Sequence, residues 1–220
     1  MIKIAIDGPG GAGKSTLAKA VAAKMGIVYV DTGALYRTIG YYVRQHDVSP
    51  EDTEGVVACL KDIKIEVKYE DGKQNVYLCG ENPGGKIRTP EMSMYASKVS
   101  AIPAVRAFLL DTQRDIAKKN SVIMDGRDIG TVILPDADLK IFLTASEECR
   151  AKRRYDELIA RGQNVRYEDV LAEMNQRDTQ DSTRDVAPTA AADDAILLDN
   201  TDMTFDQTVD KVIELANNCK

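Results

Sequence analysis

Five short runs of mostly apolar residues recur along the chain, and longer segments with helical spacing lie between them. The apolar runs are residues 2–7, 27–31, 121–125, 139–143 and 195–199. The helical patterns are residues 14–25, 34–45, 103–119, 147–160, 167–179 and 205–217. Nearly continuous apolar strands that alternate with helices are typical of a parallel sheet covered on both faces. We therefore predict an α/β fold with a five-stranded parallel sheet.

Four of the five apolar runs end in aspartate, at Asp7, Asp31, Asp125 and Asp199. The carboxyl ends of parallel strands are where ligand crevices open in open α/β sheets. Aspartate also begins many turns, so this observation alone does not establish a site.

One segment has a different period. Residues 62–87 alternate apolar and polar positions, with a hairpin signal at Asp71-Gly72 and a turn signal in the sequence ENPGG. This pattern predicts a small antiparallel β insert, with one solvated face, at about residues 62–89 of the α/β core.

The composition excludes several classes of protein. Of the 220 residues, 44% are hydrophobic and 29% charged, which is typical of a globular protein. No apolar run reaches eighteen residues, and the N-terminal apolar stretch is too short for a signal peptide, so we expect a cytoplasmic protein that does not bind membranes. The net charge of −6 argues against a nucleic-acid binder but allows a local arginine site for a small anion.

The cysteines and the single histidine do not indicate a metal site or a catalytic triad. Cys59, Cys79, Cys149 and Cys219 are scattered without a C-x-x-C pair, so we expect reduced thiols. His46 lies in a polar turn, and we expect it on the surface.

Arginines are concentrated late in the chain. Seven of the thirteen lie between Arg150 and Arg184, on both sides of a break at residues 160–164. This pattern fits a hinged helical hairpin with an arginine-rich face, although an ordinary solvated charged face is an equally good interpretation of any single arginine there.

The sequence GPGGAGKST at residues 8–16 follows the first strand and opens the first helix. Its glycines let main-chain N–H groups surround phosphate oxygens, while Lys14 can reach the outer phosphates and Ser15 can bind Mg²⁺. The alternative is a purely structural glycine turn. We predict that the chain binds a nucleoside triphosphate.

The sequence after the glycine motif narrows the class of nucleotide-binding protein. Neither the base-reading N-K-x-D motif of GTPases nor the L-S-G-G-Q motif of ABC ATPases occurs. The second strand is followed instead by DTGALYR, where Arg37 can meet a second anion beside the first.

The motifs GPGGAGKST, DTGALYR, ASKVSAIPAVR, DGRDIGT and RDTQDSTRDVAP, taken in order, resemble bacterial cytidylate kinases over essentially the whole chain. The resemblance implies an adenylate-kinase-like P-loop fold that transfers the γ-phosphoryl group of ATP to CMP and dCMP with Mg²⁺. It implies one domain of residues 1–220, and we expect the protein to be a monomer. Within it, residues 1–32, 102–146 and 185–220 form the core, residues 33–101 the acceptor region, and residues 147–184 the lid and its flanking helices.

The same resemblance assigns roles to individual residues. The ATP-binding residues would be Gly8, Pro9, Gly10, Gly11, Ala12, Gly13, Lys14, Ser15 and Thr16. The acceptor-binding residues would be Thr32, Tyr36, Arg37, Ser97, Arg106, Arg127, Asp128, Arg177, Asp181 and Arg184. The catalytic residues would be Lys14, Arg127, Arg153, Arg154 and Arg161. The metal-binding residues would be Ser15 and Asp125, the latter through water.

Some of these assignments have alternatives. Ser97 and Ser100 compete for the same place near the base, and Thr32 stands where related enzymes often have serine. Asp125 also fits a simple turn, and Arg127–Asp128 also fits a surface ion pair, although such pairs contribute little energy. The rival functions are a P-loop kinase for a hydroxyl acceptor such as shikimate or dephospho-coenzyme A, and a nucleotide-dependent regulator without turnover.

The cytosine recognition and the reaction that the resemblance implies agree with simple chemistry. Cytosine presents an N4 donor beside N3 and O2 acceptors, which suit an aspartate such as Asp128 and an arginine such as Arg106. Phosphoryl transfer depends mainly on positioning and electrostatics. An acceptor phosphate with a second pKa of about 6 needs no general base at neutral pH. Water must be excluded, so we predict a lid that closes.

Overall fold

The computed structural model describes residues 1–70 and 73–219. The chain divides into two compact units. Unit 1 consists of Met1–Ile27 and Ile123–Lys220, and unit 2 consists of Val28–Val122. No helix in the described part of the chain is both long and apolar enough to cross a membrane.

The main sheet has five strands in the order β2-β5-β1-β6-β7, with helices flanking it, as the sequence predicts. Its strands are β1 (Lys3–Asp7), β2 (Val28–Asp31), β5 (Val122–Asp125), β6 (Leu139–Thr144) and β7 (Ile196–Asp199). In the parallel registers of unit 1, Ile4 of β1 is opposite Leu139 of β6, and Ile141 of β6 is opposite Ile196 of β7.

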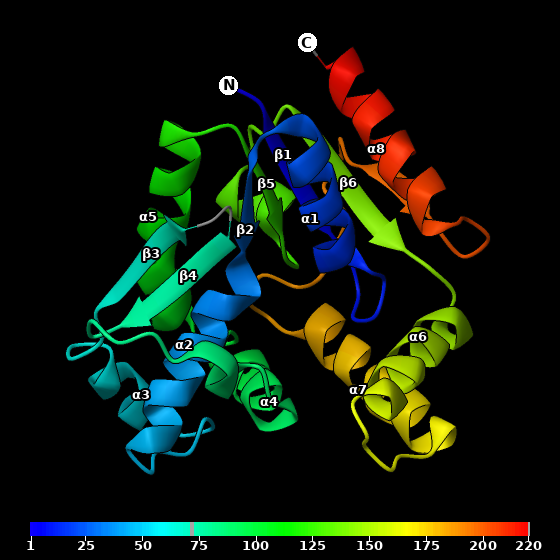
Figure 1. Cartoon of the computed structure of the whole chain (residues 1–220). Coiled ribbons are helices and arrows are strands. Elements are labelled where there is room, and N and C mark those ends of the chain that lie inside the picture. Colours follow the sequence, from blue (N-terminus) through cyan, green and yellow to red (C-terminus); the bar gives the residue numbers. More distant parts are fainter. Residues whose placement is uncertain (71–72, 220) are drawn as a thin grey trace. The chain divides into compact units, whose positions relative to one another are not determined.

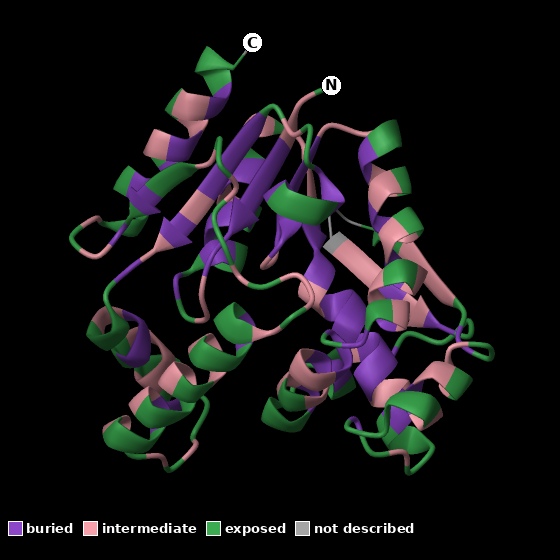
Figure 2. Cartoon of the chain, turned by 180° about the vertical axis from the view of Figure 1, so that it is seen from behind, coloured by how far each residue is buried: buried purple, intermediate pink, exposed green. Residues whose placement is uncertain are grey.

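Burial explains why the strands are so apolar. Every residue of β5 is buried, and Ile4, Ala5 and Ile6 of β1 are fully buried, as the purple strands in Figure 2 show. The edge strand β7 differs, because Leu197 is 69% exposed. At this edge strand, the side chain of Leu197 is therefore left uncovered.

The described residues of unit 1 also form four helices and a short π-helical turn. These elements are α1 (Lys14–Met25), the π turn η2 (Ile129–Ile133), α6 (Glu147–Ala160), α7 (Tyr167–Thr183) and α8 (Phe205–Asn218). Helices α1 and α8 pack against each other, and α6 and α7 form a helical hairpin (Figure 1). Between α6 and α7 the backbone turns at Gly162, which has a φ of +75°. The predicted break after residue 160 is confirmed.

Unit 2 contains the predicted β insert and its supporting helices. The insert pairs β3 (Ile65–Glu70) with β4 (Lys73–Leu78) in antiparallel register, with Ile65 opposite Leu78. The predicted Asp71-Gly72 turn lies outside the described residues. The helices are α2 (Thr32–Gln45), α3 (Thr53–Cys59), the 3₁₀ turn η1 (Gly84–Ile87), α4 (Pro90–Val99) and α5 (Pro103–Lys119). Helices α3 and α4 were not among the predicted elements.

A hydrophobic core lies beneath α2, α4 and α5 in unit 2. Its fully buried members include Leu35 and Ile39 of α2, Val99 of α4, and Leu109 of α5. Gly40 lets α2 approach α4 closely, because a Cβ there would lie 2.8 Å from Cβ of Tyr95. This core fixes the positions from which unit 2 presents its polar side chains.

The prediction that His46 lies on the surface is confirmed. Cys59, Cys79, Cys149 and Cys219 are all free thiols. His46 is exposed and stacks on Tyr42, with ring centroids 4.0 Å apart.

Candidate active site

The glycine loop of unit 1 joins the end of β1 to the start of α1 and has a geometry that only glycine allows at its first position. Gly8 has a φ of +142°, and a Cβ there would lie 2.0 Å from the carbonyl oxygen of Leu143. At the helix start, Gly13 has a left-handed conformation and no side chain caps α1. The first N–H groups of α1 are therefore not satisfied by a capping side chain, as an anion-binding helix terminus requires.

Lys14 is buried within this loop, where its Nζ donates to the carbonyl oxygen of Pro9 at 2.7 Å. Burial lowers the pKa of Lys14, and the nearby charge of Arg127 lowers it further, while Asp125 and Asp7 act in the opposite direction. A bound polyphosphate would place negative charge beside this ammonium and favour its charged form.

Ser15 and Asp125 come together at the ends of α1 and β5. The hydroxyl of Ser15 donates to Oδ2 of Asp125 at 2.6 Å. Mg²⁺ prefers oxygen ligands, and it commonly takes only one or two from protein while water and phosphate supply the rest. This pair of oxygen ligands fits a magnesium ion bound together with phosphate. The described residues contain no cluster of three or more His, Cys, Asp or Glu side chains arranged to hold a metal without such help.

Asp7, at the end of β1, holds the segment that follows Asp128. Its carboxylate accepts from the N–H groups of Ile129 and Gly130, both at 2.7 Å. Burial raises the pKa of Asp7 to about 6, against the lowering effect of these two hydrogen bonds. Asp128, just before η2, is itself 4% exposed, so the sequence DGRD is not a simple surface turn.

The arginines of the DGRD and RDTQDSTRD motifs meet around one carboxylate in unit 1. Arg127 donates from Nε to Asp181 at 3.1 Å, and charged atoms of Arg177 and Arg184 each lie 3.9 Å from Asp181. Burial would raise the pKa of Asp181, but Arg127 and Arg177, with Arg184, bring it below its ordinary value. Arg127 also borders the phosphate loop, because a Cβ on Gly10 would lie 3.9 Å from its Nη2.

This cluster fits a ligand with oxygen acceptors in one further respect. Nε of Arg177 is buried but has no hydrogen-bond partner among the described residues. Nε of Arg37, in unit 2, has the same property. Unsatisfied buried donors on guanidinium groups are costly unless a ligand accepts from them.

The remaining arginines of the α6–α7 hairpin have other partners. Arg153 donates to the side chain and the carbonyl oxygen of Asn200, both at 3.0 Å. Arg154 and Arg161 pair with Glu157 of the same hairpin, at 2.9 Å and 2.5 Å. Their predicted catalytic roles therefore require them to leave these local partners.

Unit 2 holds the predicted residues of the DTGALYR motif at the start of α2. Asp31 caps the helix by accepting from the N–H of Ala34 at 2.9 Å, and it also accepts from Arg37 at 2.9 Å. Thr32 and Tyr36 are buried on the same helix. Gln74 of β4 bonds both main-chain groups of Asp31, at 2.7 Å to its N–H and 3.2 Å to its carbonyl oxygen. The β insert thus fixes the end of β2.

Unit 2 also brings Arg106 of α5 against α2 and α4. Its Nη1 donates to the carbonyl oxygen of Ser100 at 3.0 Å, and its guanidinium lies 5.6 Å from the ring centre of Tyr36. The hydroxyl of Ser100 donates to the carbonyl oxygen of Ser97 at 2.8 Å. Both candidate serines therefore belong to the segment that positions Arg106, and their contacts do not separate them.

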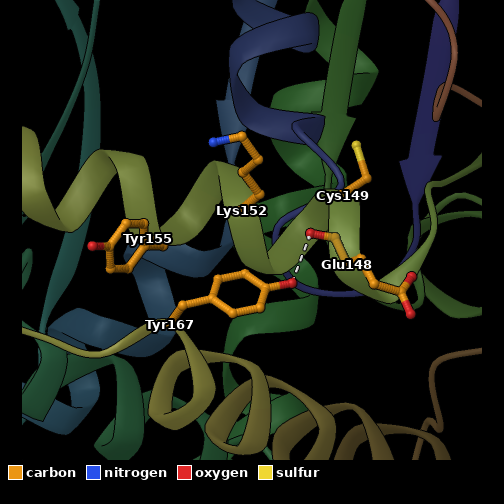
Figure 3. A pocket seen from close by; sticks show the side chains of 5 residues that line it. All are labelled: Glu148, Cys149, Lys152, Tyr155 and Tyr167. Atoms are coloured by element: carbon orange, nitrogen blue, oxygen red, sulfur yellow. Dashed lines mark hydrogen bonds between the residues drawn. The ribbon is translucent and has the colours of Figure 1, made fainter.

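A separate pocket of about 580 Å³ lies between α6 and the start of α7 in unit 1 (Figure 3). Tyr155 and Tyr167 meet edge to face there, with ring centroids 6.1 Å apart, and the hydroxyl of Tyr167 donates to the carbonyl oxygen of Glu148 at 3.4 Å. Cys149 and Lys152 complete the lining. None of these residues belongs to the predicted site.

Sequence reasoning missed two residues that contact the phosphate loop. Asp178 of α7 accepts from the N–H of Gly10 at 3.2 Å, and Arg150 of α6 donates to the carbonyl oxygen of Gly10 at 3.0 Å. Asp178 lies in the motif RDTQDSTRDVAP and Arg150 opens the arginine-rich segment, so both residues were within quoted patterns but were given no role. A pattern of that kind does not identify the partner on another element.

The parallel sheet, the glycine loop and the uncapped start of α1 define a P-loop nucleotide-binding fold. A solved structure of an uncharacterized protein from Eubacterium ventriosum is similar in fold, with a TM-score of 0.56 at 16% identity, and the match covers 99% of this chain and 98% of that one.

The chain matches the family described as cytidylate kinase over residues 4–218, and it belongs to that family. The cytidylate kinase of Caldicellulosiruptor bescii is 50% identical over 214 residues, covering 97% of this chain and 95% of the relative. That of Thermosipho melanesiensis is 48% identical over 219 residues, covering 99% and 98%. The chain is therefore an enzyme of the nucleoside monophosphate kinase class, and the predicted resemblance is confirmed.

Proposed function

We propose that this enzyme transfers the γ-phosphoryl group of ATP to CMP and dCMP. The observation that supports this proposal most strongly is Arg127, which borders the phosphate loop at Gly10 and is paired with Asp181. A kinase whose acceptor is already a phosphate must hold a second polyanion beside the first. A kinase for a hydroxyl acceptor such as shikimate has no such need. The names of the relatives agree with a CMP acceptor.

In this mechanism the residues of the glycine loop hold the donor. Main-chain N–H groups of residues 10–16 surround its phosphates, and Lys14 leaves Pro9 to bind the outer phosphates. Ser15 and Asp125 would hold Mg²⁺, Asp125 through water, and the ion would neutralise charge on the phosphates of ATP. Stabilising the charge of the transferring group is the largest contribution that such a site makes to the rate.

The acceptor phosphate is held by arginines. Arg127 and Arg184, together with Arg37 of unit 2, are the proposed phosphate ligands, while Arg177 and Asp181 bind the ribose. The acceptor is largely a dianion at neutral pH, so it attacks without a general base. The α6–α7 hairpin acts as the lid, and Arg153, Arg154 and Arg161 move toward the transferring group when it closes.

Cytosine is recognised by Arg106 and Asp128, with Ser97 or Ser100 near the base. Arg106 is rigidly held by Tyr36 and Ser100, as a group that reads a base requires. Asp128 accepts from the N4 amino group, and Arg106 donates to the base acceptors. Thr32 and Tyr36 line the acceptor site. We further propose that units 1 and 2 act as one functional domain in a cytoplasmic monomer of pyrimidine nucleotide metabolism.

The decisive experiment is a coupled assay of ADP release with ATP and a panel of acceptors, namely CMP, dCMP, UMP, AMP, GMP and shikimate. We expect the highest kcat/KM with CMP and dCMP. Preferred turnover of AMP, GMP or shikimate would refute the proposed acceptor. ATP binding without turnover on any acceptor would indicate a nucleotide-dependent regulator instead.

A further inference from the structure

Two charged side chains bracket a single peptide group of the phosphate loop. The N–H of Gly10 donates to Oδ1 of Asp178, while the carbonyl oxygen of Gly10 accepts from Nη1 of Arg150. The same nitrogen of Arg150 also donates to Oδ2 of Asp178. Asp178 and Arg150 therefore form a closed set of hydrogen bonds with Gly10.

Helix α7 also packs directly on the loop beside this contact. A Cβ on Gly11 would lie 2.7 Å from Cε of Met174 and 3.1 Å from Cβ of Arg150. Met174 and Asp178 are four residues apart, so they share one face of α7. That face covers the loop at Gly10 and Gly11, where the N–H groups of a P-loop would turn toward phosphate.

A second pair of positions on α7 faces the arginine cluster. Arg177 and Asp181 are also four residues apart, and Asp181 pairs with Arg127 and Arg184. Asp178 and Asp181 thus lie one helical turn apart, the former against the loop and the latter among the arginines. The carboxylate of Asp178 lies against a main-chain N–H group of the loop, and that of Asp181 lies among arginines, so both places favour an anion.

We propose that Asp178 is an internal anion that holds the phosphate loop before the donor binds, and that the phosphates of the donor displace it. This inference rests on the proposed function, because it takes the glycine loop as the donor site. The carboxylate of Asp178 and a donor phosphate would both accept from the N–H of Gly10. They also repel each other at short range, so one must leave when the other arrives.

Displacement of Asp178 has a consequence for Arg150 and for α7. Arg150 is buried with only 6% of its side chain exposed, and its charge is balanced by Asp178 in the contact described above. When Asp178 leaves, this guanidinium becomes available to the donor. Because Asp178 and Asp181 belong to one rigid helix, movement of the first also shifts the second within the arginine cluster. Asp178 is thus a positioning residue that links donor arrival to the acceptor-side arginines.

The test is equilibrium binding of ADP by calorimetry without added magnesium, comparing the unaltered protein with Asp178→Asn. Asparagine keeps the size of the side chain and an oxygen for Gly10, but it removes the competing charge. We expect ADP to bind the variant about three- to tenfold more tightly. A purely structural role predicts equal or weaker binding in the variant, and that result would overturn the proposal.

Asp169→Asn is the matched control, because it removes the same charge from α7 at a position where 71% of the side chain is exposed. It should leave ADP affinity unchanged, and equal tightening in both variants would overturn the proposal by showing a general charge effect. If the unaltered protein binds no ADP at all, the donor assignment itself fails. If the unaltered protein binds ADP normally but Asp178→Asn does not bind it more tightly, only the proposal for Asp178 fails.

A second measurement needs no variant and decides the question even if Asp178→Asn fails to fold. The NMR signal of the Asp178 carboxyl carbon in the unaltered protein should shift as ADP saturates the site, since the carboxylate loses Gly10. An unchanged signal at saturation would show that Asp178 stays in place and would contradict the proposal.

Discussion

The arginine cluster of unit 1 and Arg106 of unit 2 are held in different ways. In unit 1, Arg127, Arg177 and Arg184 surround the single carboxylate of Asp181, so several like charges lie close together. In unit 2, Arg106 donates to the main-chain carbonyl group of Ser100, and its guanidinium lies against the ring of Tyr36. A crowded positive cluster gains most from an added anion, whereas an arginine held by a carbonyl group and an aromatic ring keeps a fixed direction. The first arrangement suits phosphate binding, and the second suits reading the shape of a base.

The largest expected effect concerns the chemistry of unit 1. Lys14→Ala should lower kcat by about a hundredfold or more, because a positive charge near the transferring phosphoryl group is lost. Steady-state kinetics with ATP and CMP measures the change. Lys24→Ala, in the exposed last turn of α1, is the control and should retain normal kcat. Near-normal turnover of a folded Lys14→Ala would contradict the assignment of the phosphoryl-transfer chemistry to unit 1.

A pH experiment tests how unit 1 tolerates buried charge. The pKa of Asp7 is raised to about 6, so the folded state binds its proton more tightly than the unfolded state does. The stability that Asp7 contributes is therefore full below about pH 4 and is lost as the pH rises through 6. The loss should amount to about 3 kcal/mol.

Urea unfolding of the unaltered protein and of Asp7→Asn is measured at several pH values between 4 and 7. The loss is the change with pH in the difference between their free energies of unfolding. Asp136→Asn, with 77% of its side chain exposed, serves as the control. A difference that stays constant across this range would show that Asp7 has an ordinary pKa.

The smallest effect is expected for Gln74 in unit 2, an uncharged side chain whose role resembles that of Asp7 in unit 1. Gln74, like Asp7, binds two main-chain groups, but it carries no charge. Gln74→Ala should lower the free energy of unfolding by about 1 kcal/mol, independent of pH between 4 and 7. Asn75→Ala, whose side chain bonds only the exposed Glu70, should cost less in the same urea experiment. Equal costs for the two variants would mean that Gln74 does not fix the end of β2.

The sequence predicted the elements better than the contacts between them. Local patterns located all five strands of the main sheet, and the glycine motif located the loop at Gly8. Helix α4 was missed although Thr89 and Pro90 are a good start signal for a helix. The alternating apolar and polar positions just before it drew the interpretation toward a β insert. The interaction of Asp7 with Gly130 joins residues 123 positions apart, and no local pattern encodes it.

The same limit applies to the candidate site. Lys14 and Ser15 were predicted because their roles depend on one contiguous loop. Asp178 was missed because its role depends on where α7 packs, which is decided by tertiary contacts such as that of Met174 with Gly11. Arginine motifs indicated an anion site but did not show that Asp181 would be its centre.

The most direct test of the contrast between the units is the ratio of kcat/KM for CMP to that for UMP. It is measured in the unaltered protein, in Lys14→Ala and in Arg106→Met, with Lys118→Met as the exposed control on α5. Uracil has a hydrogen on N3 where cytosine has an acceptor, so loss of Arg106 should remove a favourable contact with CMP and an unfavourable one with UMP. We predict that the ratio falls about tenfold or more in Arg106→Met, while Lys14→Ala loses activity on both substrates at an unchanged ratio. An unchanged ratio in Arg106→Met, or a changed ratio in Lys14→Ala, would contradict the division of roles.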